Sequence, residues 1–164
     1  MIRIATAECF THGKVGLEIH SISRGYYMNL SHSLDYEASR LSLVAALFIP
    51  TLSGVRSVLG FEPPEPDDML DGIKVYTDEK DKITAIKMAK AVRSITGADI
   101  GIGATAGIGK GAVAVVNEGT ILTGSSGVYA DLRRSDADEI MKRQESGIKE
   151  AFSLLERMLK ENYS

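Results

Sequence analysis

Apolar residues recur along the chain with two different spacings, and these predict an alternation of strands and helices. Short apolar runs bounded by glycine, proline or polar residues are typical of buried strands. The runs that predict strands are residues 2–7, 24–30, 73–76, 98–104, 112–117 and 120–124. The run at 24–30 is expected only as an edge strand. Glu118 and Gly119 join the last two runs, which are therefore expected to form a β-hairpin.

Apolar residues spaced three and four apart predict the helices of the chain. These helices are expected over residues 13–22, 36–49, 78–95 and 136–162. Pro50 and Gly97 are expected to end the second and third helices, and Asp78 and Asp136 to cap the third and fourth. Strands that alternate with helices predict an α/β fold, here a single-domain three-layer α/β/α sandwich over residues 1–164.

One segment between these elements, GFEPPEPDD at residues 60–68, is expected to be a surface loop. It contains three of the four prolines of the chain together with four acidic residues. An acidic, solvated loop is favoured over a lid that closes on a ligand.

Composition and charge exclude several classes of function. The 164 residues carry a formal net charge of -3 with both signs interspersed, so no basic stripe is available for a nucleic-acid backbone. No apolar run approaches the ~18 residues that a membrane span needs. A single cysteine cannot form an internal disulfide, which favours a reducing, cytoplasmic location. We therefore expect neither a nucleic-acid nor a membrane partner.

The only cysteine, Cys9, lies where the first strand is expected to end and the first helix to begin. Backbone N–H groups at a helix N-terminus favour a thiolate, which is the nucleophilic form of cysteine. Thr11 and His12 are near enough in sequence to donate a hydrogen bond or to move a proton. A lone cysteine is also often a small buried apolar residue, so both interpretations stay open.

The segment GATAGIGKG, residues 103–111, follows a predicted strand and is rich in glycine, as where a ligand approaches the backbone closely. It resembles a P-loop, but Ala104 replaces the first glycine and Gly111 replaces the serine or threonine. Thr105 and Lys110 are candidates to hold a phosphate or a carboxylate. The alternative is a tight turn between two strands.

Two arginines, Arg133 and Arg134, precede the last predicted helix, with Ser125 and Ser126 nearby. Arginine suits phosphate because its planar fork donates two parallel hydrogen bonds. An exposed pair with acidic neighbours is an equally good interpretation. The three histidines lack the spacing of metal ligands, so no metal site is predicted.

Three stretches resemble the CinA C-terminal domain family, the nicotinamide mononucleotide amidohydrolases. IATAECFTHG resembles the family's TAESCTGG opening, GADIGIGATAGIGKGAVAVV its GADLAxAxTGIAGPGG segment, and GVYADLRRSD its GDR…R segment. The family's nucleophilic serine is replaced by Cys9, which follows Glu8. The resemblance implies the CinA-like α/β fold, and amide hydrolysis with Cys9 as nucleophile is one alternative function.

The whole chain is more similar to the archaeal HcgF family, small methanogen proteins with an N-terminal Ala-Glu-Cys element and this glycine-rich segment. That resemblance implies a role in making the iron-guanylylpyridinol (FeGP) cofactor of [Fe]-hydrogenase. It implies that Cys9 takes the carboxyl group of guanylylpyridinol as a thioester, after a partner protein has adenylylated that group. The chain would then be a homodimeric, thioester-forming acyl carrier or transferase, with guanylylpyridinol as its ligand and no permanently bound cofactor.

The resemblance also implies a set of site residues. The expected catalytic residues are Cys9, Thr11 and His12, and backbone N–H groups of residues 10–13 are expected to stabilise the developing oxyanion. The expected ligand contacts are Glu8, Phe10, Gly13, Thr105, Gly107, Gly109, Lys110 and Arg133. A non-catalytic nucleotide-binding protein, in which Cys9 is merely buried, is the other alternative.

Overall fold

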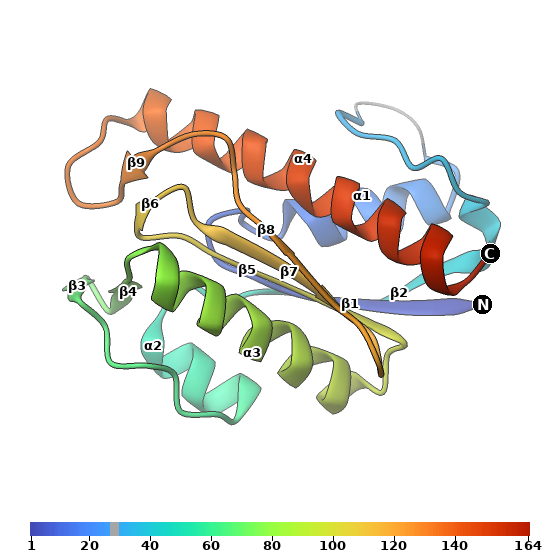
Figure 1. Cartoon of the computed structure of the whole chain (residues 1–164), viewed down its shortest axis with the longest axis horizontal. Helices are drawn as coiled ribbons and strands as arrows, with labels where there is room; N and C mark the ends of the chain where they lie inside the picture. Colours follow the sequence, from blue (N-terminus) through green and yellow to red (C-terminus); the bar gives the residue numbers. More distant parts are fainter. Residues whose placement is uncertain (27–29) are drawn as a thin grey trace.

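The computed structural model describes residues 1–26 and 30–164, and a five-stranded mixed sheet lies at its centre (Figure 1). The order of the strands is β2-β1-β5-β7-β8. Strand β1 is parallel to both β2 and β5, whereas β7 is antiparallel to β5 and to β8. The bounds are β1 Ile2–Glu8, β2 Leu41–Phe48, β5 Ile100–Thr105, β7 Ala112–Val116 and β8 Ile121–Gly124.

Helices cover both faces of this sheet, which confirms the predicted three-layer α/β/α architecture (Figure 1). Helices α1 (Lys14–Ser23) and α4 (Ala137–Asn162) lie on one face, and α3 (Asp78–Thr96) with the short α2 (Leu52–Gly54) lies on the other. The smaller elements are η1 (Ala38–Arg40), η2 (Val55–Leu59), β3 (Asp68–Leu70) paired with β4 (Ile73–Val75), and β6 (Ile108–Gly109) paired with β9 (Ala130–Asp131).

Successive side chains of the central strands point to opposite faces of the sheet, so the core has two layers. In β5, Ile100 and Ile102 pack in the core cluster shared with α1 and α4. Gly101 and Gly103 point the other way, and a Cβ atom at either position would overlap a backbone carbonyl oxygen of α3. The two glycines therefore allow α3 to lie directly against the sheet.

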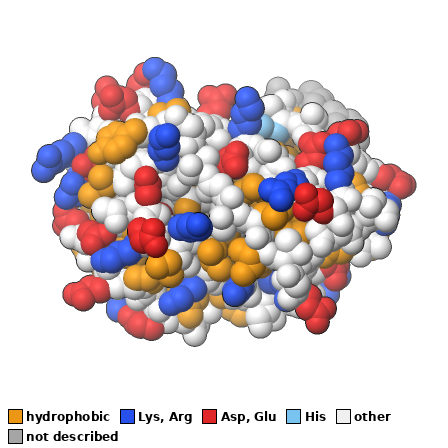
Figure 2. Space-filling model, viewed as in Figure 1, with side chains coloured by type: hydrophobic (Ala, Val, Ile, Leu, Met, Phe, Trp, Pro, Cys, Tyr) orange, Lys and Arg blue, Asp and Glu red, His pale blue; other side chains and the backbone are white. Residues whose placement is uncertain are grey.

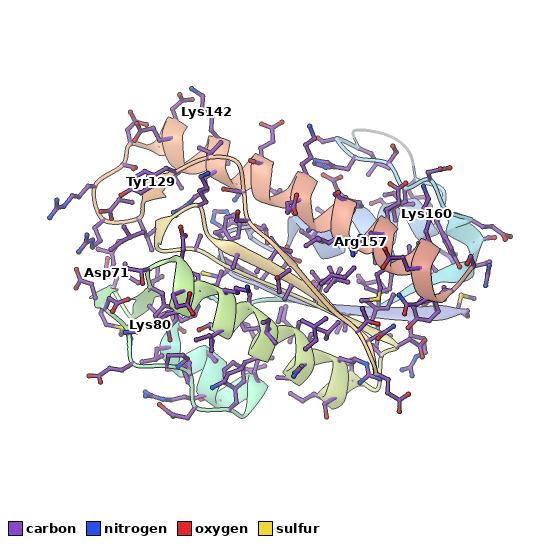
Figure 3. All side chains as sticks on the ribbon, viewed as in Figure 1. Asp71, Lys80, Tyr129, Lys142, Arg157 and Lys160 are labelled. Carbon is purple, nitrogen blue, oxygen red and sulfur yellow. The ribbon has the colours of Figure 1, made fainter. Side chains whose placement is uncertain are left out.

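The outer surface of α4 is polar, as its amphipathic sequence predicts. Lys142, Arg157 and Lys160 project from this helix (Figure 3), and each pairs with a carboxylate one turn away. Acidic and basic side chains are interspersed over the visible face of the molecule (Figure 2). Within the described part of the chain, the helices are too short or too polar to cross a bilayer.

Most of the predicted elements are confirmed. The strands at 2–7, 73–76 and 98–104, the hairpin at 112–124 and the helices at 13–22, 78–95 and 136–162 all form, with ends shifted by at most two residues. Asp136 caps α4 by accepting a hydrogen bond from the Glu139 N–H at 2.9 Å. Gly97 ends α3 in the left-handed conformation, with φ 65°.

The helix predicted over residues 36–49 is wrong. After the single turn of η1, this segment forms β2, an edge strand in parallel register with β1. Its exposure alternates, with Val44, Ala46 and Phe48 exposed, as in a strand covered on one side. A short apolar run fits helical and strand spacing equally well, and here the free edge of β1 decides between them.

Three smaller predictions have different outcomes. Asp78 is the first residue of α3 rather than its cap, because Thr77 occupies the N-cap position. The centre of the strand proposed at 24–30 lies outside the described residues, and Arg24 and Gly25 belong to a turn. Residues 60–67 form a loop without regular structure, as predicted, before β3 begins.

Candidate active site

Cys9 follows directly after β1, at the end of the sheet where β6 and β9 lie (Figure 1). Its N–H donates to the carbonyl oxygen of Ala104 in β5 at 2.8 Å, so the residue continues the strand pairing by one position. The free thiol is 5% exposed. Cys9 is nevertheless accessible from one side, because it borders a cavity of about 140 Å³.

This cavity, named here the Cys9 cavity, is mainly apolar. Besides Cys9 itself, His12 and Arg143 are its only lining residues with polar side chains in the described part of the chain. The apolar lining residues are Phe10, Phe48, Pro50, Ile73, Ala106, Leu132 and Ile140. The thiol, an imidazole and a guanidinium thus share one small apolar space.

A tight turn connects Cys9 to α1. The His12 N–H donates to the Cys9 carbonyl oxygen at 3.1 Å, which removes one of the four N–H groups expected to stabilise an oxyanion. His12 and Gly13 both have positive φ, 54° and 78°, and Gly13 occupies the N-cap position of α1. A glycine suits this position because a β-carbon is strained at such angles.

The N-terminus of α1 points at Glu8 rather than at Cys9. The Glu8 carboxylate is fully buried and accepts hydrogen bonds from the N–H groups of Val15 and Gly16, both at 3.0 Å. The hydroxyls of Thr6 and Thr11 complete the set at 2.8 and 2.6 Å. Glu8, expected to contact the ligand, and Thr11, expected to be catalytic, therefore hold the β1–α1 connection together, and their polar groups are already paired.

His12 borders the Cys9 cavity and contacts the ring of Phe48, with 5.2 Å between the ring centroids. Partial burial lowers the pKa of His12, the nearby Lys14 lowers it further, and Glu8 opposes this shift. This lowered pKa favours the neutral imidazole, the form that can accept a proton.

Phe10 is held from two sides. Its carbonyl oxygen accepts a hydrogen bond from the Gln144 side chain at 3.0 Å. Its ring packs against Gly147 of α4, where a β-carbon would overlap the ring atoms. This packing places Phe10 as a wall of the Cys9 cavity.

The glycine-rich loop, residues 107–111, is anchored to the protein through its N–H groups. Gly107 donates to the Asp81 carboxylate at 3.0 Å, Ile108 to the Tyr76 carbonyl oxygen at 2.7 Å, and Gly111 to Asp78 at 3.1 Å. These three N–H groups are therefore not available to cradle a phosphate. Of the other residues expected to bind ligand here, Thr105 is buried at the end of β5, whereas Lys110 is exposed.

Arg133 lies outside the Cys9 cavity and is paired with two carboxylates. Its guanidinium contacts Asp131 and Asp68, each at 3.0 Å, and so joins β9 to β3. A phosphate would have to displace these partners. Arg134 is exposed. Across residues 1–26 and 30–164, no three His, Cys, Asp or Glu side chains are grouped to hold a metal ion.

Arg143 of α4 is the residue at this site that the sequence analysis missed. It is 1% exposed, and its Nη1 atom donates to the carbonyl oxygens of Gly107, Gly109 and Ala130 at 2.9, 3.0 and 2.8 Å. A signal was present, because Arg143 lies on the same helical face as Ile140 and Gly147. A charged residue in an otherwise apolar stripe indicates a buried role.

Asp81 of α3 is a second missed residue, and it is also fully buried. Burial raises the pKa of its carboxyl group to about 7, although the Gly107 N–H, Lys74, Thr105 and Arg143 all favour the charged form. Lys74 is 1% exposed, and its Nζ atom has no hydrogen-bond partner among the described residues. The glycine-rich loop is thus anchored by two buried side chains, Asp81 and Arg143.

We expect the Asp81 carboxyl group to make stability depend on pH. Its pKa is raised from 3.8 to about 7 on folding, so between these pH values the folded chain binds more protons than the unfolded chain. The contribution of Asp81 is therefore fully present below about pH 4 and is lost as the pH rises to about 7. Urea unfolding of the wild type and of Asp81→Asn at pH 5 and pH 8 measures it.

The Asp81→Asn variant should lose less stability than the wild type between pH 5 and pH 8, since an amide keeps the bond to Gly107 without titrating. Equal losses in the two proteins would contradict the assignment.

The arrangement of sheet and helices matches solved structures of the CinA superfamily. A CinA superfamily protein from Enterobacter cloacae matches with a TM-score of 0.61 at 18% sequence identity, over 96% of this chain and 82% of the other. The competence damage-inducible protein A (ComA) of Klebsiella pneumoniae matches with a TM-score of 0.59 at 15% identity, over 99% and 89%. The fold is therefore CinA-like, with a cysteine at the end of its first strand.

Sequence comparison identifies one family among the proteins that share this fold. The model of the family described as FeGP cofactor biosynthesis protein HcgF matches residues 1–159. A UPF0254 protein of Methanothermobacter thermautotrophicus is 58% identical over 97% of this chain and 99% of that relative, and one of Methanocorpusculum labreanum is 50% identical over 98% and 94%. The chain belongs to the HcgF family of FeGP cofactor biosynthesis proteins.

Proposed function

We propose that the chain forms a thioester between Cys9 and the carboxyl group of guanylylpyridinol, after another protein has adenylylated that group. The observation that carries the proposal is the position of the only cysteine, on the wall of a small apolar cavity shared with a neutral imidazole and a guanidinium. Family membership supports the pathway, and the residues around Cys9 support the chemistry.

The proposed step is an acyl transfer. The Cys9 sulfur attacks the carbonyl carbon of the acyl-adenylate, a C–S bond forms, and the C–O bond to the phosphate breaks. Adenosine monophosphate leaves with the electron pair of that bond. The thiol proton passes to His12, whose lowered pKa favours the neutral ring that can accept it. The thioester keeps the acyl group reactive while tethering it to the protein.

The Cys9 cavity has room for the pyridinol part of the ligand but not for the whole molecule. At about 140 Å³ it is comparable to an engineered cavity of ~150 Å³ that holds one benzene ring. The pyridinol ring and its carboxyl group fit such a space, whereas the guanylyl group has to extend beyond it. Among the expected ligand contacts, Phe10 and His12 border this cavity, and exposed Lys110 is available to the part outside.

A homodimer is part of the proposal. Strand β2 lies at one edge of the sheet, and Val44 and Phe48 on it are 38% and 52% exposed. Apolar side chains along an edge strand favour pairing with a second copy. Sedimentation equilibrium tests this, and a purely monomeric species at micromolar concentration would contradict it.

Intact-protein mass spectrometry tests the thioester. The protein, guanylylpyridinol, ATP and the adenylylating partner are mixed, and we expect one hydroxylamine-labile adduct per chain. Cys9→Ala should show none, and its circular dichroism spectrum should match that of the wild type, because the side chain is small and buried.

Two outcomes separate the alternatives. Continuous release of ammonia from nicotinamide mononucleotide, lost in Cys9→Ala, would favour an amidohydrolase with Cys9 as nucleophile. An unmodified, well-folded wild-type protein would leave a non-catalytic nucleotide-binding role.

A further inference from the structure

The guanidinium of Arg143 is held rigidly at one edge only. All three of its hydrogen bonds leave from Nη1, toward the carbonyl oxygens of Gly107, Gly109 and Ala130. The Nε atom is buried and has no hydrogen-bond partner among the described residues. Bracing of the loop therefore uses only part of the donor capacity of this side chain, since an arginine offers five N–H groups.

No carboxylate in the described ranges pairs directly with Arg143. The buried carboxylate of Asp81 in α3 accepts a hydrogen bond from the Gly107 N–H instead. Burial lowers the pKa of Arg143, and the charges that oppose this, those of Asp81, Cys9, Asp131 and Asp78, act at longer range. A buried guanidinium without a paired anion is expensive, and native structures retain such groups where they have a use.

The position of Arg143 indicates what that use is. Its side chain lines the Cys9 cavity together with the thiol, and its guanidinium carbon lies 6.0 Å from the ring centroid of Phe10, another wall of that cavity. Three carbonyl oxygens already fix the orientation of the group, so little conformational entropy remains to be lost when an anion binds.

We propose that Arg143 forms a carboxylate subsite beside Cys9, in which its guanidinium binds an anionic oxygen on the carbon atom that the thiol attacks. This deepens the proposed function, on which it rests for the identity of the acyl group. In the acyl transfer, the same guanidinium faces the oxygen on which negative charge develops. The substrate class of the site is then an aromatic or otherwise flat acid small enough for the Cys9 cavity.

Alkylation of Cys9 tests the subsite without guanylylpyridinol. Iodoacetate carries a carboxylate and iodoacetamide is its neutral counterpart, so the ratio of their rate constants reports on binding of the carboxylate near the thiol. We expect this ratio to be at least tenfold higher in the wild type than in Arg143→Gln, with Arg143→Lys between them. Arg133→Gln is the matched control, because that guanidinium lies outside the cavity and is paired with Asp68 and Asp131.

Equal ratios in the wild type and in Arg143→Gln would overturn the subsite and leave Arg143 as a brace for the loop. If a thermal melt shows that Arg143→Gln does not fold, a second measurement on the wild type tests the subsite: the protection of Cys9 from iodoacetamide by small acids. Benzoate should slow the alkylation at concentrations where benzamide does not, and equal protection by both would overturn the proposal. A carboxylate preference without any thioester adduct would sink the acyl-carrier function alone, whereas an adduct without the preference would sink only the subsite.

Discussion

Replacement of Glu8 by glutamine is expected to lower the free energy of unfolding by about 3 kcal/mol or more. The Glu8 carboxylate is fully buried and accepts four hydrogen bonds, two from hydroxyls and two from the first N–H groups of α1. An amide offers one acceptor oxygen instead of two. Its NH₂ group would face the N–H of Val15 or Gly16, which are donors themselves.

Urea unfolding followed by circular dichroism measures this loss. Glu118→Gln is the matched control, because Glu118 is exposed in the turn between β7 and β8, and its change should stay within about 0.5 kcal/mol. A Glu8→Gln protein as stable as the control would show that the N–H groups of α1 find other acceptors. Because the same turn positions Cys9 and His12, we also expect Glu8→Gln to slow the alkylation of Cys9.

Replacement of Gly103 by alanine is expected to destabilise the protein by about 3 kcal/mol, at the upper end of the range for overpacked cores. A β-carbon there would overlap the backbone carbonyl oxygen of Ala85 in α3. Backbone atoms of a helix cannot rotate away as a side chain can, so α3 must move off the sheet. For a domain of this size the melting temperature should fall by roughly 6–12 °C.

Thermal melts of Gly103→Ala and Gly119→Ala compare the same change in two places. A β-carbon at Gly119 meets no atom of the described residues within 4 Å, so that variant should melt close to the wild type. Equal melting temperatures of the two variants would mean that α3 can move away from the sheet with little loss of stability. The displacement should also reach the glycine-rich loop, since Asp78 and Asp81 of α3 accept hydrogen bonds from Gly111 and Gly107.

The sequence alone was sufficient where a pattern has one physical solution. The apolar run from Ile2, the glycine-thinned run from Ile100 and the hairpin around Glu118-Gly119 are each bounded by turn residues, which favours strands over helices, and each forms as predicted. The 26-residue amphipathic pattern of α4 is likewise too long for a strand. The end of β1 as the place of Cys9 follows from these elements.

The candidate site was only partly predictable. The sequence places Cys9, Phe10 and His12 at the turn after β1, and all three border the Cys9 cavity. It could not show that Glu8 and Thr11 bond to each other, because a side chain three residues away is free to point inward or outward until the core forms. Arg143 lies more than 130 positions from Cys9, and only the packing of α4 on the sheet brings the two to one cavity.

The sequence by itself therefore determined the α/β class, most of its elements and the position of the nucleophile candidate, since local periodicity and turn residues specify these, whereas the CinA-like fold was implied by resemblance to a known family. Only the tertiary structure decided that Leu41–Phe48 is a strand, because pairing with the edge of β1 outweighs a weak local preference. It also decided that α1 directs its first N–H groups to Glu8, and that Arg143 meets the glycine-rich loop next to Cys9. Those contacts join segments far apart in the chain, and their energies arise only when both partners leave water together.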